Sequence, residues 1–339
     1  MKRLLFILFL LPTFTECFVS NYELQSPSGQ KLVILGDAHR KEIDSLNKYH
    51  IEVFIEFIKH LESNLEEGET KLNVVYELEE RFIDTISHSD ENVALTIRYL
   101  NDFVKSYRAN FFKFRAYDAR GTFSELLNSL SANLEAMIFS NSSERQKMQH
   151  IIYTSLCEHR DDITVGQYFE FFKEEFKKIM FCRDNWKQNS KEYETLNVTV
   201  EVFRKAQSQL EKLFRNYEKN ESLFKSIISI TEKELSHFSY AAAIQLIFDL
   251  ICRETDFVLA DACYLNQIFK GNIDLLICGE AHAKNLLNLL TKMGYIVLSQ
   301  DVNYIEKMLP PEKGGKITLI RPNDSMVESF CHSIAWLFY

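Results

Sequence analysis

Two stretches of the sequence, Leu32–Leu46 "LVILGDAHRKEIDSL" and Asp274–Leu290 "DLLICGEAHAKNLLNLL", follow the same plan. Each begins with an apolar run, breaks at Gly, acid, Ala and His, and continues with helical spacing. An apolar run that turns at Gly into an amphipathic segment is typical of a buried parallel strand followed by a helix. Ligands of α/β proteins bind beyond the carboxyl ends of such strands. We therefore expect His39 and His282 to share one site if their strands are neighbours.

The alternation of strands and helices continues around both stretches and predicts an α/β fold. Expected strands are 31–36, 71–80, 112–121, 273–279, 295–301 and 316–322, and expected helices are 41–65, 92–111 and 283–294. Continuous apolar strands separated by helices favour a mainly parallel central sheet flanked by helices.

The middle of the chain has a different character. Residues 122–270 show helical periodicity with hardly any Gly or Pro, and turn-like breaks occur at 140–145, 159–164 and 218–223. The expected sheet begins before this block and is completed after it. We therefore predict an α/β core formed by 18–121 and 271–339, with 122–270 as a large all-helical insertion or cap. Two separate domains are the alternative.

The first 17 residues, "MKRLLFILFLLPTFTEC", have a basic start, a short apolar stretch, and then Pro and polar residues. This order is typical of a secretory signal peptide, so we expect an exported protein, periplasmic or secreted, whose mature chain starts near Phe18. An uncleaved anchor, with peripheral membrane association, is the alternative. No later stretch has the length of apolar sequence that a membrane-spanning helix needs.

The composition of the chain indicates which classes of partner it can bind. A chain of 339 residues with 46% apolar content can bury a large core, and its formal net charge of −9 disfavours nucleic acid. A small-molecule or peptide substrate is the expected partner. The cysteines after residue 17 are scattered without a C-x-x-C pair, which predicts neither a zinc knuckle nor a thioredoxin-like site. Some of them are candidates for disulfides after export.

Acidic residues accompany both histidines. Asp37 and Glu280 each precede a His by two positions, and Glu77 follows the apolar run "VVY" in the expected strand 71–80. Asp37 and Glu280 are candidates to hold an imidazole tautomer, to join a metal shell or to act as a base. Glu77 needs a partner or a ligand if it is buried, although a solvated strand end would also explain it.

His39, His282 and Glu77 together form a candidate metal site. Two imidazoles and one carboxylate suit Zn²⁺, Mn²⁺ or Fe²⁺ and leave open positions for water, which favours hydrolytic chemistry. Without a metal, one His could activate water while a carboxylate orients it. Asp118 and Arg120 lie at the end of the third expected strand, where they either orient substrate or pair with each other.

The pair GDAH at 36–39 and GEAH at 279–282 resembles the two G-x-x-H motifs of a known superfamily. This superfamily joins TraB/GumN and TIKI-type proteins, ChaN-like haem-binding proteins and erythromycin esterases. The segment 260–295 is similar in layout to the C-terminal part of TraB and TIKI proteins, and Glu77 stands where relatives carry an acid after the second strand. The resemblance covers roughly 31–120 and 253–300.

This resemblance implies an erythromycin-esterase-like or ChaN-like α/β fold and cleavage of a peptide or ester bond, assisted by a divalent metal. It also implies two alternatives: a non-enzymatic haem, iron or metal binder, or a secreted interaction protein with an inactive site. The chain departs from TraB and TIKI relatives where they carry Arg-Asn, because it has Ala260 and Asp261 instead. Arg253, two helical turns earlier, is the candidate substitute for substrate binding.

Overall fold

The computed structural model describes residues 18–37, 55, 59, 71–78, 80, 83–86, 95–106, 112–118, 120, 130, 133–134, 137, 144–158 and 162–302. The expected signal peptide 1–17, His39, nearly all of the expected helix 41–65, and the expected last strand 316–322 lie outside these residues. No helix in the described ranges combines the length and the apolar character needed to cross a membrane.

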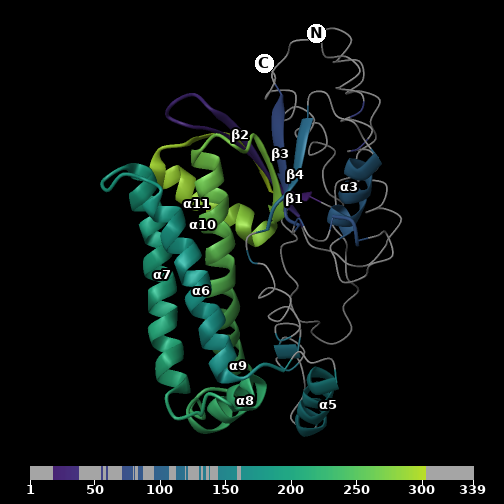
Figure 1. Cartoon of the computed structure of the whole chain (residues 1–339), viewed down its shortest axis with the longest axis vertical. Helices are drawn as coiled ribbons and strands as arrows, with labels where there is room; N and C mark the ends of the chain where they lie inside the picture. The colour runs from purple at the N-terminus through teal and green to yellow at the C-terminus, as the bar shows by residue number, and fades with distance from the viewer. Residues whose placement is uncertain are drawn as a thin grey trace, which may run out of the picture. The chain divides into compact units, whose positions relative to one another are not determined.

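The described strands form one mixed sheet. They are β1 Phe18–Gln25, β2 Lys31–Asp37, β3 Leu72–Tyr76, β4 Phe112–Ala116, β5 Leu275–Gly279 and β6 Ile296–Val302, in the order β4-β3-β5-β2-β1-β6. The four strands β4, β3, β5 and β2 run parallel, whereas β1 is antiparallel to both β2 and β6. The expected α/β fold is therefore confirmed at the level of a mostly parallel sheet with flanking helices (Figure 1).

Strand β1 was not expected from the sequence. Its residues "FVSNYELQ" include polar side chains that hide the strand pattern, yet Ser20, Asn21 and Glu23 are all buried. They are buried because β1 lies inside the sheet, between β2 and β6. A tight turn joins β1 to β2, with Gly29 at φ 89°, a backbone conformation that glycine adopts without steric cost.

Helices cover both faces of the sheet. Directly paired residues of neighbouring strands point to the same face, so Gly36 shares a face with Cys278, and Tyr76 shares a face with Ile277. Because Ile277 and Cys278 are successive residues of β5, Gly36 and Tyr76 point to opposite faces of the sheet. Helix α11, Glu280–Met293, packs on β1, β2 and β5 above Gly36. The Tyr76 hydroxyl, on the other face, donates to Asn101 of helix α3, Leu95–Ser106. Because both faces are covered, the apolar strands can be buried throughout.

The chain divides into two compact units, with boundaries after Asp118 and after Asn266. The second unit is helical in its described residues. Its helices are α5 Arg145–Glu158, α6 Val165–Asp184, α7 Lys191–Phe214, α8 Leu223–Lys233, α9 Tyr240–Phe248, the π-helix η2 Asp249–Phe257 and α10 Val258–Phe269, whose last residues belong to the first unit.

Helix caps and aromatic contacts define this helical unit. Thr164, Ser190, Ser222 and Ser239 each cap a helix by accepting a backbone N–H, which places the breaks between helices. Helix α7 packs against α6 and η2 (Figure 1). The ring centroids of Phe172 and Phe203 are 4.3 Å apart and both side chains are buried, so these rings form part of the core of the helical unit.

Candidate functional site

The strands β2, β3 and β5 end at the same edge of the sheet. Asp37, the last residue of β2, pairs with Gly279 at the end of β5, and Tyr76 at the end of β3 pairs with Ile277. Glu77 continues this register, because its N–H donates to the Ile277 carbonyl at 3.0 Å. The strand order therefore brings Asp37, Glu77 and the start of α11 to one edge.

Glu77 and His282 face each other at this edge. The Glu77 Oε1 atom lies 3.7 Å from His282 Nε2, and the two side chains are 4% and 3% exposed. This separation is too long for a hydrogen bond and short enough for a close electrostatic contact. The acid expected after the second strand and the second expected histidine thus meet in a buried position.

The second carboxylate oxygen of Glu77 is fixed by the backbone. Gly279 N–H donates to Glu77 Oε2 at 2.7 Å, and Gly279 is the residue at which α11 begins. The N-terminus of a helix favours a negative group, since its first N–H groups lack partners within the helix. This contact explains how an anionic carboxylate is tolerated in a buried place, and it leaves Oε1 directed at His282.

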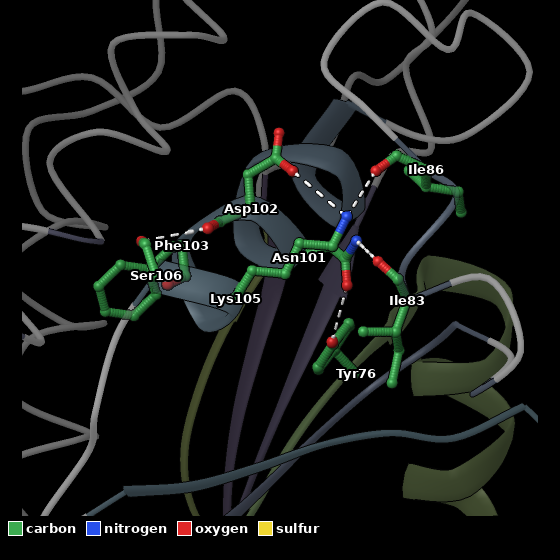
Figure 2. Close-up of polar contacts among 8 residues, drawn as sticks. All are labelled: Tyr76, Ile83, Ile86, Asn101, Asp102, Phe103, Lys105 and Ser106. Atoms are coloured by element: carbon green, nitrogen blue, oxygen red, sulfur yellow. Dashed lines mark hydrogen bonds and ion pairs between the residues drawn. The ribbon is translucent and has the colours of Figure 1, made fainter.

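The segment after β3 is anchored on α3. Figure 2 shows Asn101 receiving a hydrogen bond from the Tyr76 hydroxyl at 3.2 Å and donating to the Ile83 carbonyl at 2.9 Å. Lys105 of the same helix donates to the Ile86 carbonyl at 2.9 Å. Burial raises the pKa of Tyr76 to about 12, so its hydroxyl remains a donor at neutral pH. These bonds hold both ends of the segment that starts with Glu77.

Glu280 is held on another side of α11. Its Oε2 accepts a short hydrogen bond from the Ser20 hydroxyl of β1, and Lys284 lies 2.9 Å from its Oε1. Both Ser20 and Glu280 lie directly above Gly36, where an added Cβ would overlap them and would also come within 3.2 Å of the Ala283 Cβ. The Gly of the first motif is therefore needed for close approach. Of the two acids near His282, Glu77 is the one that faces the imidazole. The contact of Ser20 with Glu280 was not expected from the sequence.

Asp37 and His39 belong to the first strand-end motif. Asp37 is buried, at 2% exposure, at the end of β2 and opposite Gly279. His39 follows two positions later and lies outside the described residues, so its distance from His282 stays a prediction. The parallel neighbours β2 and β5 satisfy the condition set by the sequence, namely that the two motifs follow adjacent strands.

Three residues were expected to bind substrate. Asp118 lies beyond β4, close to the end of the first unit, and Arg120 belongs to the second unit. The Arg120 guanidinium is 3.4 Å from Asp256 Oδ2, and both side chains are almost buried. Arg120 thus has an acidic partner on η2 within the helical unit.

Arg253 does not lie in a regular α-helix, as its expected place beside Ala260 requires. It lies in η2, and its side chain is outside the described part. The expected match between Arg253 and Ala260 assumed two regular α-helical turns, but η2 is a π-helix with more residues per turn. The spacing of seven positions therefore no longer places both residues on one face. Ala260 and Asp261 are buried in α10, at 1% and 2% exposure.

The fit to a metal ion rests on Glu77 and His282. Metal–ligand bonds to imidazole and carboxylate are roughly 2.0–2.2 Å, so atoms 3.7 Å apart can bind one ion. No group of three or more His, Cys, Asp or Glu with metal-binding geometry occurs among the described residues, and the third expected ligand, His39, is not one of them. Binding of haem iron by His282 Nε2 would require it to turn away from Glu77.

Comparison with known proteins gave no match of significance, whether against family models, curated proteins or solved structures.

Proposed function

We propose that this chain is an exported hydrolase of the TraB/TIKI and erythromycin-esterase-like type, which cleaves a peptide or an ester bond. The observation that carries the proposal is the buried contact between Glu77 and His282 at the carboxyl edge of the parallel strands. A buried acid and imidazole are costly to desolvate, so their placement together at a ligand-binding edge favours a chemical role. The signal-like residues 1–17 support export.

Glu77 would orient His282. In the metal-free form of this proposal, Gly279 N–H holds Oε2, and a shift that closes the 3.7 Å gap would let Oε1 accept the imidazole N–H and so fix its tautomer. A histidine paired in this way accepts a proton from water more readily and can return it to the leaving group. Glu77 is thus the positioning residue, and His282 is the proposed proton carrier.

In the metal-assisted form of the proposal, Glu77, His282 and His39 would instead hold Zn²⁺, Mn²⁺ or Fe²⁺, and His282 would then not carry the proton. When bound, such an ion lowers the pKa of its water and polarises a carbonyl. Asp37 and Glu280 are the candidate bases in this arrangement, because Asp37 ends β2 and Glu280 begins α11 at the same edge. Asp118 keeps its proposed substrate-binding role, because it follows β4 in the unit that carries this edge.

The test uses the full chain with a panel of chromogenic esters and quenched fluorescent peptides, each with and without the three ions. His282→Ala and Glu77→Gln are compared with His237→Ala and Glu80→Gln, which change exposed residues. Loss of a general base or of its orienting group lowers kcat/KM by roughly 10²–10⁴-fold. We expect such a loss in the two site variants and less than about a twofold change in the controls, with circular dichroism verifying the fold.

Three results would contradict the proposal. Turnover that persists unchanged in both site variants would place the chemistry elsewhere. Stoichiometric iron or a Soret band without turnover on either panel would support the haem-, iron- or metal-binding alternative. A folded chain with neither turnover nor a bound ligand would support the interaction-protein alternative.

A further inference from the structure

Two buried cysteines from distant parts of the sequence meet in the helical unit. Cys182 lies near the end of α6 and Cys263 in the middle of α10, and their Sγ atoms are 3.7 Å apart. Both residues are 4% exposed. The two positions are 81 residues apart in the chain, so the fold and not local sequence brings the sulfurs together.

We propose that Cys182 and Cys263 form a disulfide that closes most of the helical unit into one covalent loop. A disulfide requires an S–S distance of about 2.05 Å, so the present separation has to shorten by about 1.6 Å. Rotation of the two side chains about χ1, with a small approach of the helices, supplies a movement of this size. Cys157, which is exposed, instead has its sulfur 3.9 Å from Asp162 Oδ2.

A neighbouring contact keeps the two helices in the register that the bond needs. The Trp186 indole N–H, just beyond the end of α6, donates to Asn266 Oδ1 of α10 at 3.1 Å. Trp186 follows Cys182 by four positions, and Asn266 follows Cys263 by three, so this bond lies about one helical turn further along both helices. The helices are therefore locked at the level of the two sulfurs before any covalent bond forms.

The reaction balances as two successive thiol–disulfide exchanges with an external disulfide such as oxidised glutathione. One cysteine thiolate attacks that disulfide, forming a mixed disulfide and releasing one glutathione thiolate. The second cysteine thiolate then attacks the protein sulfur and releases the other glutathione. The two cysteines are oxidised, the glutathione disulfide is reduced to two thiols, and the two protons from the protein thiols are taken up by the glutathione thiolates.

The expected consequence is a large rise in thermal stability. A bond that closes a long loop restricts the unfolded chain more than one that closes a short loop. For a loop of this length in a chain of this size, we expect the melting temperature of the helical unit to rise by roughly 5–15 °C on oxidation. Reduction with dithiothreitol should reverse the shift.

The test is a peptide map of the full wild-type chain. The chain is refolded in glutathione buffers with increasing fractions of the disulfide form, alkylated, digested without reductant and analysed by mass spectrometry. We expect a linked peptide that joins Cys182 to Cys263, which disappears after reduction. Cys157→Ser is the matched control and should retain the linked peptide and the temperature shift, whereas Cys182→Ser and Cys263→Ser should lose both.

Absence of that linked peptide from the oxidised wild-type chain would overturn the proposal, because this measurement does not depend on any variant folding. A dominant link from Cys182 or Cys263 to a different cysteine would overturn it as well. A linked peptide without any change in melting temperature would show that the bond does not restrain the unfolded chain as proposed.

Discussion

At the scale of single residues, the glycine of the first motif is explained by what lies above it. A Cβ added at Gly36 would overlap the ends of the Ser20 and Glu280 side chains, which would have to shift, and would come within 3.2 Å of the Ala283 Cβ. The sequence pointed to Gly36 as a turn position. The structure gives a different reason, since Gly36 lies within β2 and permits close approach of α11.

Gly36→Ala should therefore destabilise the fold by about 1–3 kcal/mol, as expected for overpacking a buried site. The same substitution in a Glu280→Ala background should cost less, because one of the two overlapping groups is gone. Urea unfolding of the wild type, both single variants and the double variant measures this coupling. Strictly additive effects would contradict the overlap.

Asp274 gives the first unit a pH-dependent stability. Burial raises the pKa of its carboxyl group above the ordinary value of 3.8, although two hydrogen bonds from Asn73 to its Oδ2 counteract part of the rise. The folded state then holds the proton more tightly than the unfolded state. The contribution of Asp274 to the free energy of unfolding is complete below the ordinary pKa and is lost as pH rises through the raised pKa.

The free energy of unfolding of the wild type should thus fall, relative to Asp274→Asn, as pH is raised from the ordinary aspartate pKa of 3.8 toward neutrality. Urea midpoints measured for both proteins across this range give the comparison. Parallel pH profiles would show that the carboxyl group titrates alike in the folded and unfolded chains.

At the scale of elements, α3 holds the segment that carries Glu77. Asn101 is fully buried and bonds both the Tyr76 hydroxyl and the Ile83 carbonyl. Asn101→Ala removes the hydrogen-bond partner of the Tyr76 hydroxyl and of the Ile83 carbonyl, which should lower the free energy of unfolding by about 1–3 kcal/mol. Ser106→Ala is the control on the same helix, because its exposed hydroxyl only bonds carbonyls of its own helix (Figure 2).

Hydrogen exchange locates this effect. Amides of 77–78 and 83–86 should exchange faster in Asn101→Ala and at wild-type rates in Ser106→Ala. Unchanged exchange in Asn101→Ala would mean that α3 does not hold the segment in place.

The helical unit contains a buried ion pair of its own. Arg120 and Asp256 lie 3.4 Å apart with little exposure. Arg120→Met leaves the Asp256 carboxylate buried without its cation and should cost about 3 kcal/mol in stability. Arg204→Met is the control, because its ion pair with Glu201 is exposed on α7 and should contribute less than about 1 kcal/mol. Equal losses in both variants would contradict a structural role for Arg120.

The sequence predicted some elements much better than others. Strands β2, β3 and β5 were found because their runs are mainly apolar, as burial on both faces requires. Strand β4, "FKFRA", was found although Lys113 and Arg115 interrupt its apolar residues. Strand β1 was missed because Ser20, Asn21 and Glu23 interrupt its pattern, and these residues are buried only through tertiary pairing. The helix boundaries at Thr164, Ser190, Ser222 and Ser239 carry capping signals that a closer reading would have used.

At the scale of the whole molecule, strand order decides which predicted residues meet. The strands that end at Asp37 and Gly279 are far apart in the sequence, with 242 positions between these two residue numbers, and only the parallel pairing of β2 with β5 makes their ends neighbours. The sequence placed Glu77 and His282 at strand ends but did not give their hydrogen-bond partners. Nothing in residue spacing shows that Gly279 N–H binds Glu77, or that Ser20 engages Glu280. Such contacts depend on strand order, which a single sequence does not specify.

The most direct test of the central claim, that Glu77 and His282 belong to one metal-assisted site, is a Co²⁺ titration of the full chain followed by visible absorption. The account predicts one bound ion per chain, a loss of affinity of at least about tenfold in His282→Ala and in Glu77→Gln, and no loss in His237→Ala. Absence of Co²⁺ binding by the wild-type chain would contradict this claim. Equal affinity for Co²⁺ in the wild type and in all three variants would contradict it as well.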